Sequence, residues 1–362
     1  MTVWAAAEAP LCRNLQNPFF ERYVMNLTDS KYSRFALVKE MLQTVDVIRG
    51  FDFGQTAGAA KTVKETGRLF LTGEGSSRIF PAKSFMYGVL KRGLPIAVAT
   101  DGSFQAAEYN LSDWVVAGAS NSGQTKEVIA LMKKLGETGH HKRIGITAHE
   151  GTTLAEVTDE CFVLSCGNED AVAATKSVIE QGLVYRSILC NLIDCECPKN
   201  KEKAADLAAE VMQTEYDPAI IEKLAKANLL YFAGRNNGVA EELTLKTNEI
   251  TRKKSDYLEG TYLLHGVEEV MSAGDACILI DPFPSEYGKI KEFIEGRAGL
   301  TVIAVANEDT PFPTIKLPKL TGYDPFLQLM AGWNLLVQIG IALGIDLDKP
   351  ERARKVGNQF EG

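Results

Sequence analysis

The sequence lacks the features of an exported or membrane-spanning protein. Its 362 residues contain no apolar run close to the roughly 18 residues that a membrane span requires. The first 20 residues, MTVWAAAEAPLCRNLQNPFF, show no basic start followed by a sustained apolar stretch, as an export signal would. We therefore expect a cytoplasmic protein with no membrane partner.

Positive charge and paired cysteines are also scarce. Lys and Arg number 39 against 47 Asp and Glu, and the net charge of −8 argues against nucleic acid as a partner. The seven cysteines are odd in number and lie partly in apolar segments (Cys161, Cys190 and Cys277), which favours buried free thiols over a disulfide framework. The cluster CNLIDCEC, residues 190–197, has neither CxxC spacing nor a nearby histidine, so we expect no metal site there.

The residues that are present favour an α/β fold. Apolar residues make up 45% of the chain, and its length suits two domains. Short β-branched runs alternate with helical patterns, which is typical of parallel sheets. We expect strands at 68–73, 95–100, 114–119, 143–148 and 161–165, and again at 228–234, 276–282, 300–307 and near 314–318. The predicted organisation is a helical leader over 1–49, one domain over 50–200, a second over 201–348 and a tail over 349–362.

A turn rich in hydroxyl groups stands between a predicted strand and a predicted helix. It reads ASNSGQT and contains Ser120, Ser122, Gly123 and Thr125. The first N–H groups of a helix are unpaired and carry the positive end of its dipole, so an anion such as phosphate fits there. Ordinary capping by one hydroxyl, with the others solvated, is the alternative reading.

A second small-residue turn, GEGSSR over 73–78, follows the first predicted strand. Open parallel sheets bind ligands at the carboxyl ends of their strands, where both turns lie. The turn begins a GxGxxG pattern, but Arg78 stands in the third glycine position, so we exclude a dinucleotide site. A P-loop is excluded too, because no glycine is followed by Lys-Ser or Lys-Thr at the required spacing.

The segments GEGSS, ASNSGQT, AVAATKS and LKTNEI, with a later LLHG and a lysine near the C-terminus, resemble the sugar isomerase (SIS) family. Their order is similar to that in the isomerase half of glucosamine-6-phosphate synthase and in fructosamine-6-phosphate deglycases. The resemblance spans nearly the whole chain and implies two tandem SIS domains. Each would be a parallel sheet flanked by helices in a flavodoxin-like three-layer α/β/α arrangement. It further implies a homodimer with shared active sites, and a mechanism without metal or organic cofactor.

The resemblance also assigns sugar 6-phosphate binding to three segments. The family consensus is SxSGxT for the main turn and ASTK for the third segment. The matching residues are Ser76 and Ser77 in the first turn, Ser120, Asn121, Ser122, Gly123 and Thr125 in the second, and Thr175 in the third. Asn121 takes a slot that is often glutamine, and Ala174 replaces the serine of ASTK, which removes one ligand hydroxyl.

A glutamate and a histidine sixteen residues apart, Glu249 and His265, match the catalytic pair of the resembled enzymes. There the glutamate moves a proton between C1 and C2 of the sugar and the histidine assists ring opening, which suits the general acid–base chemistry of both groups. Lys246 lies one helical turn before Glu249 and either faces the same pocket or forms a surface ion pair. Lys355 matches a C-terminal lysine that opens the ring through a Schiff base, with a solvated tail as the alternative.

Three functions remain open at this stage. The chain lacks an N-terminal glutaminase segment in its first few dozen residues, so we expect amino-sugar chemistry in the catabolic direction. The first hypothesis is a deaminase or deglycase that acts on amino-sugar or fructosamine 6-phosphates through an open-chain enaminol. The alternatives are a plain aldose/ketose phosphate isomerase and a non-catalytic sugar-phosphate-binding regulator.

Overall fold

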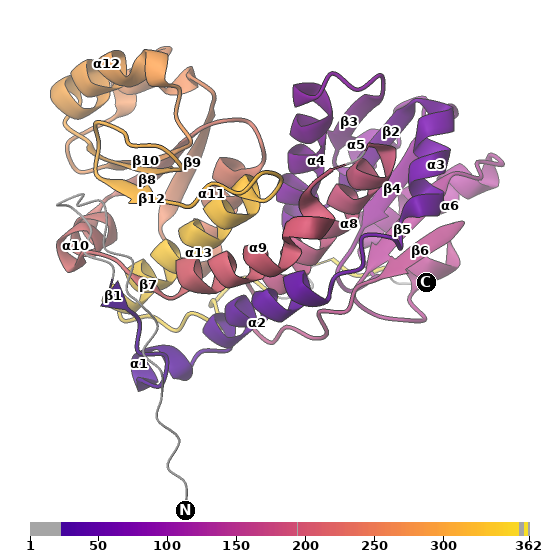
Figure 1. Ribbon diagram of the computed structural model, residues 1–362, viewed down its shortest axis with the longest axis horizontal. Helices are drawn as coiled ribbons and strands as arrows, with labels where there is room; N and C mark the ends of the chain where they lie inside the picture. Colours follow the sequence, from indigo (N-terminus) through magenta and orange to yellow (C-terminus); the bar gives the residue numbers. More distant parts are fainter. Residues whose placement is uncertain (1–22, 194, 355–357, 361–362) are drawn as a thin grey trace, which may run out of the picture.

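The computed structural model describes residues 23–193, 195–354 and 358–360, so Lys355 lies outside the described residues. Two parallel sheets of five strands each dominate the fold, and they occupy separate lobes (Figure 1). Helices flank both sheets, which confirms the predicted α/β class. The first sheet lies within the predicted range 50–200 and the second within 201–348, while the division into two SIS domains stays a prediction.

The first sheet has the strand order β3-β2-β4-β5-β6. Its strands are β2 (Arg68–Gly73), β3 (Ala97–Asp101), β4 (Val115–Ala119), β5 (Arg143–Thr147) and β6 (Glu160–Val163). Every residue of β4, VVAGA, is buried, as expected for a strand covered on both faces. The carboxyl ends of β2 and β4 lie side by side, since Gly73 is paired with Ala119. The two small-residue turns therefore meet at one edge of this sheet.

The second sheet has the order β12-β11-β10-β8-β9. Its strands are β8 (Leu229–Gly234), β9 (Lys254–Glu259), β10 (Ala276–Ile280), β11 (Thr301–Ala306) and β12 (Thr314–Lys316). When the five strands of each sheet are numbered along the sequence, strand 1 lies between strands 2 and 3, and strands 4 and 5 follow beyond strand 3. The second lobe thus repeats the 2-1-3-4-5 strand order of the first, which is the flavodoxin-like order.

The sequence did not predict β9. Its residues KSDYLE are mostly polar, and only Leu258 among them is buried. An edge strand needs apolar side chains on fewer positions than a central strand, so its composition resembles that of a loop. A further short antiparallel pair, β1 (Tyr23–Val24) with β7 (Thr214–Glu215), ties the start of the described chain to the middle.

Helices pack against both sheets and against one another between the lobes. They are α1 (Ser30–Ser33), α2 (Ala36–Gly50), α3 (Ala57–Thr66), α4 (Ile79–Lys91), α5 (Ser103–Ala106), α6 (Lys126–Glu137), α7 (Thr153–Glu156), α8 (Lys176–Leu192), α9 (Cys197–Met212), α10 (Pro218–Lys226), α11 (Val239–Thr251), α12 (Tyr287–Lys289) and α13 (Asp324–Ala342). Figure 1 shows α2, α9 and α13 running between the lobes, where α9 packs on both of the others. The largest cluster of buried apolar side chains includes residues from both sheets, so one core joins the two lobes.

Helix α13 is the one helix in the described part of the chain that is long and apolar enough to cross a membrane. The sequence reading had found no such run. However, 83% of its most apolar window is buried inside the protein. Its position between α9, α10 and α11 makes it the central helix of the shared core.

The expectation of free thiols is wrong for two cysteines. Cys190 at the end of α8 and Cys195 in the following linker are joined by a disulfide. Cys161, Cys166, Cys197 and Cys277 are free, as expected. Sequence spacing could not predict the bond, because it forms where α8 ends and the chain turns back into α9.

Candidate active site

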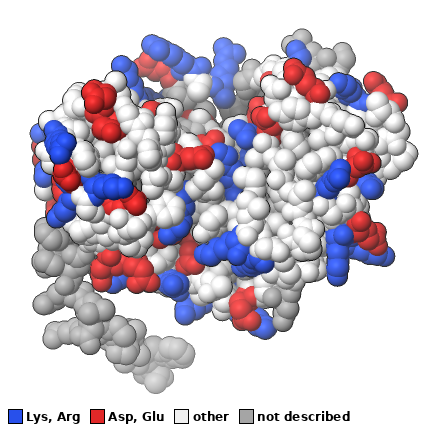
Figure 2. All heavy atoms as spheres, turned by 90° about the horizontal axis from the view of Figure 1, so that it is seen from above, with Lys and Arg blue, Asp and Glu red and all other residues white. Residues whose placement is uncertain are grey.

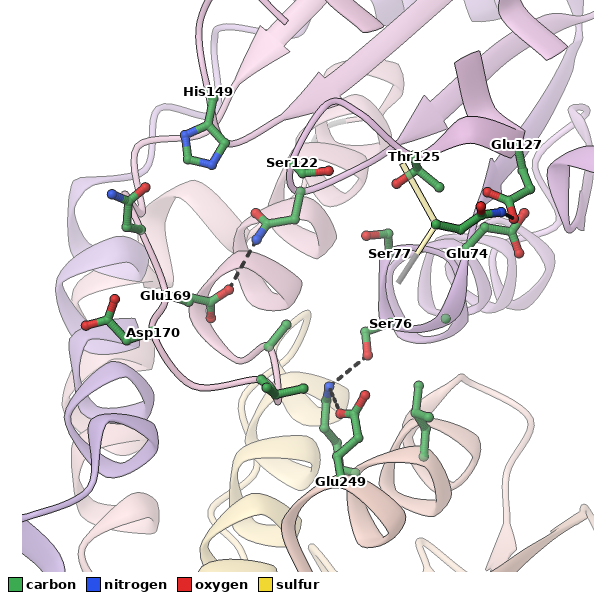
Figure 3. Close-up of a pocket in the computed structure, with 18 residues that line it drawn as sticks. Glu74, Ser76, Ser77, Ser122, Thr125, Glu127, His149, Glu169, Asp170 and Glu249 are labelled. Carbon is green, nitrogen blue, oxygen red and sulfur yellow. Dashed lines mark hydrogen bonds and ion pairs between the residues drawn. The ribbon is translucent and has the colours of Figure 1, made fainter. Parts of the chain in front are cut away.

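A cavity of about 550 Å³ opens at the carboxyl ends of the first sheet and is closed on one side by α11 of the second lobe. Seven of the predicted site residues line it: Ser76, Ser77, Asn121, Ser122, Thr125, Lys246 and Glu249. Figure 3 shows Ser76 pointing across from the first lobe toward Glu249 on α11. Both lobes thus contribute polar side chains to one site.

The ASNSGQT turn is braced from within. The Oγ atoms of Ser120 and Thr125 lie 2.7 Å apart, and the Thr125 amide donates to Ser120 Oγ at 3.3 Å. Ser120 is buried behind the cavity wall and does not line the cavity. Gly123 has φ +62°, and a Cβ there would lie 2.4 Å from the Thr152 side chain. These two predicted residues therefore shape the turn, while its cavity-lining hydroxyls come from Ser122 and Thr125.

The end of the chain covers part of the same turn. The Lys126 amide donates to the Asn358 carbonyl oxygen at 3.4 Å, and the Phe360 amide donates to the Gln124 carbonyl at 2.9 Å. The Asn358 side chain lines the cavity and donates to Glu127 Oε1 at 2.5 Å. One amide at the start of α6 is thus occupied by the chain itself. Predicted Lys355 belongs to the same tail but lies outside the described residues.

Thr175 does not line the cavity, and its contacts lie inside the protein. It is fully buried at the start of α8, and its amide donates to Glu169 Oε1 at 2.7 Å. The Ser177 hydroxyl donates to the other carboxylate oxygen of Glu169 at 2.6 Å. Glu169 therefore receives the first donors of α8 and lines the cavity beside them.

Three charged residues on α11 form a buried chain that reaches the cavity. Lys246 Nζ lies 2.7 Å from Glu249 Oε2, 3.6 Å from Glu242 Oε1 and 2.8 Å from Ser76 Oγ. The Lys246 side chain is 1% exposed and that of Glu242 is fully buried, whereas Glu249 reaches the cavity at 22%. Lys246 is therefore no surface ion pair: it connects the α11 carboxylates to the first serine turn (Figure 3).

Burial and the neighbouring charges shift the pKa values of Lys246 and Glu242 in opposite directions. Burial alone would lower the pKa of Lys246, but the carboxylates of Glu249 and Glu242 outweigh it and raise that pKa. Burial raises the pKa of Glu242, and the ammonium of Lys246 opposes this rise. Lys246 is thus fully protonated in the folded protein below the ordinary lysine value of 10.5. The stability contributed by its raised pKa is lost as the pH rises through that pKa.

We expect Lys246→Met to lower the free energy of unfolding by about 3–5 kcal/mol at neutral pH, because it leaves Glu242 buried without a cation. In this variant the pKa of Glu242 stays above its ordinary value, so stability should fall further as the pH rises above about 5. Urea unfolding at pH 5 and pH 8 measures both effects. Lys246→Met with Glu242→Gln should recover most of the loss, and equal stability of the single and double variants would contradict the buried pair.

His265 does not lie with Glu249 in this chain. It is exposed and lines a separate hollow with Tyr257, Glu259 and Tyr262. The predicted pairing of the two residues within one site is therefore not present in the single chain. The sixteen-residue spacing spans the end of α11, strand β9 and a turn, which carry the histidine away from the cavity.

The cavity contains charged residues that the sequence reading missed. His149 follows β5, and Glu74 follows β2, so both stand at the carboxyl ends of strands of the first sheet. Asp170 and Glu127 also line the cavity. Figure 3 places His149 on the side opposite Glu249. Open parallel sheets bind ligands at the carboxyl ends of all their strands, so the position of His149 directly after a predicted strand was a signal for it.

In the comparison with known proteins, the match to a family model falls in the first lobe. Residues 63–190 match the model of the SIS domain family, in one place along the chain. Glutamine–fructose-6-phosphate aminotransferase (isomerizing) of Bacillus subtilis is 23% identical over 366 residues, covering 94% of this chain. The chain spans 59% of the length of that relative.

Solved structures show the same fold. Glucosamine-6-phosphate deaminase of Thermotoga maritima has a TM-score of 0.67 at 21% identity, with 89% of this chain and 99% of that chain covered. Tagatose-6-phosphate ketose/aldose isomerase of Escherichia coli has a TM-score of 0.69 at 18% identity, with 88% and 97% covered. At these identities the likeness shows the fold alone, and it extends over both lobes. Residues 63–190, which supply both serine-containing turns of the cavity, are thus the part of the chain that is similar to the SIS domain family.

Proposed function

We propose that the protein is a phosphosugar enzyme that acts on amino-sugar or fructosamine 6-phosphates. One observation carries the proposal: the hydrogen-bonded chain from Ser76 through Lys246 to Glu249. It places a carboxylate in the same cavity as the hydroxyls of an SIS domain. The deaminase and isomerase that share this fold act on sugar 6-phosphates, as their names state.

Glu249 is the base in this proposal. An open-chain sugar bound with its phosphate at the serine turn would present C1 and C2 to α11. The carboxylate takes a proton from one carbon and returns it to the adjacent carbon, with an enaminol between the two steps. Lys246, held by Glu242 and Ser76, fixes the position of the carboxylate and balances its charge. Water then cleaves the resulting imine and releases the amine.

The charge of the cavity favours a substrate that carries an amine. Five carboxylates line it, those of Glu74, Glu127, Glu169, Asp170 and Glu249, and the described lining contains one ammonium, that of Lys246. A protonated amine would offset part of this negative charge, whereas a plain hexose phosphate would add to it. Plain isomerisation and binding without turnover are therefore the second choices.

The face shown in Figure 2 carries acidic and basic side chains interspersed over its surface. No broad basic patch, such as a nucleic-acid-binding surface carries, dominates the face in view. A nucleic acid partner is not part of the proposal.

We further propose a homodimer in which a second copy supplies His265 to the cavity. The support is geometric: in the single chain His265 is exposed and lies in a hollow of its own. Exposure leaves its imidazole accessible to a neighbouring copy. His149 already stands in the cavity and is the in-chain alternative for a proton-transfer histidine.

An assay with several products measured together tests the function. The purified protein is incubated with glucosamine 6-phosphate and with a panel of fructosamine 6-phosphates, and ammonia, free amine and hexose phosphates are measured. Ammonia with fructose 6-phosphate identifies a deaminase, and free amine with glucose 6-phosphate a deglycase. Turnover of plain hexose phosphates alone would replace the proposal by isomerisation. Binding without any turnover would replace it by a regulator.

A further inference from the structure

Three cysteines gather at the junction of α8 and α9, far along α8 from the cavity. Cys190 lies near the end of α8, Cys195 in the linker and Cys197 at the first residue of α9. Their Sγ atoms all lie within 4.8 Å of one another. Cys190 and Cys195 are joined by the disulfide, and Cys197 is a free thiol that is 2% exposed. None of the three belongs to the proposed active site.

A buried cation stands beside this cluster. Arg186, one helical turn before Cys190, is 4% exposed, and its Nη2 donates to Ser84 Oγ at 3.3 Å. Burial lowers the pKa of Arg186, and a negative charge at Cys197 and the Asp324 carboxylate act in the opposite direction. Among the residues that the structure describes, however, Arg186 has no ion pair with a carboxylate. A buried charge of this kind requires a partner of opposite sign.

The cluster is accessible from one side. A hollow of about 440 Å³ is lined by Cys190, Asn191 and Lys201, and by the turn between α2 and α3 that contains Asp52. Cys190 and Cys195 are partly exposed, in contrast to Cys197. A small reductant or an ion can therefore reach the disulfide, whereas the Cys197 thiol is buried.

We propose that reduction of the Cys190–Cys195 disulfide converts this cluster into a three-thiolate site for a thiophilic divalent cation such as Zn²⁺. Two reductant thiols reduce the disulfide and leave as their own disulfide, or one phosphine and one water molecule do so and leave as the phosphine oxide. In either case Cys190 and Cys195 become thiols. Three thiols then release three protons to bind one cation. The complex of three thiolates with a divalent cation has a net charge of −1 and pairs with Arg186.

The geometry fits this ligand set. Zn–S bonds of about 2.3 Å in a tetrahedral site place sulfur atoms about 3.8 Å apart. Sulfur atoms that already lie within 4.8 Å need only small side-chain movements to reach that spacing.

Titration of the full chain with Co²⁺, a coloured probe for such sites, tests the proposal. After reduction by a phosphine, the wild type should bind one Co²⁺ with thiolate-to-cobalt absorption in the near ultraviolet, and Zn²⁺ should displace it. The oxidised wild type should show no such absorption. Cys197→Ser should bind at least about tenfold more weakly, since it removes one of three ligands. Cys161→Ser, a half-buried free cysteine on β6, is the matched control and should bind like the wild type.

Cys190→Ser guards against a folding artefact, because it leaves buried Cys197 untouched. It should also lose the absorption, and circular dichroism and thermal unfolding check that each variant is folded. Zn²⁺ should raise the melting temperature of the reduced wild type and leave that of Cys190→Ser unchanged. Reduced wild type without the absorption, or equal absorption in Cys197→Ser, would overturn the proposal. These readouts need no turnover and so do not depend on the proposed enzyme function.

Discussion

Glu249→Gln is expected to lower kcat by about 10²–10⁴-fold while sugar-phosphate binding persists. Glutamine keeps the size of the side chain but cannot take a proton from carbon. Lys246 keeps its contacts with Ser76 and Glu242, so the α11 chain and the cavity wall should remain in place. In the proposed function the phosphate is bound by the serine turns across the cavity, which this substitution does not touch.

Steady-state kinetics on the substrate identified by the panel measures kcat, and calorimetry measures binding of the same compound. The matched control is Glu241→Gln on the same helix, whose carboxylate pairs with Lys83 and does not line the cavity. The control should retain wild-type kcat. Turnover of Glu249→Gln at the wild-type rate would remove Glu249 from the role of base, and loss of binding together with kcat would make it a binding residue instead.

A mixture of two inactive variants is expected to regain activity if a second copy supplies His265. Glu249→Gln and His265→Ala each break every site of their own homodimers. In a mixed dimer with shared sites, one site combines an intact Glu249 with an intact His265. Random exchange makes half of the dimers mixed, so activity should return to about a quarter of the wild type.

The mixed sample is prepared by unfolding and refolding the two variants together, and each variant refolded alone is the control. A site built from one chain predicts no recovery, because every site then lacks one of the two groups. Kinetics of His149→Ala and His265→Ala, each measured alone, test the in-chain histidine that lines the cavity: if His149 transfers the proton, His149→Ala should lose kcat while His265→Ala keeps it. Recovery near a quarter in the mixture would support the shared site, and full activity of His265→Ala alone would favour His149.

The sequence predicted the fold class because periodicity carries that information. All-buried strands such as β4 and β10 read as continuous apolar runs, and each alternates with helices. β9 escaped this reading because a polar edge strand has no apolar pattern to detect. The serine-rich turn was also predictable, since hydroxyls and Gly123 stand together in seven successive residues.

The sequence by itself determined two parallel sheets, the serine-rich turn before α6 and the placing of Lys246 one helical turn before Glu249, because each depends on residues close together along the chain. Only the tertiary structure decided which of them meet. It joined Ser76 to Lys246 across 170 positions, moved His149 into the cavity and left His265 outside it. Contacts of this kind follow from how the two lobes pack on their shared helices, and no local pattern records that packing.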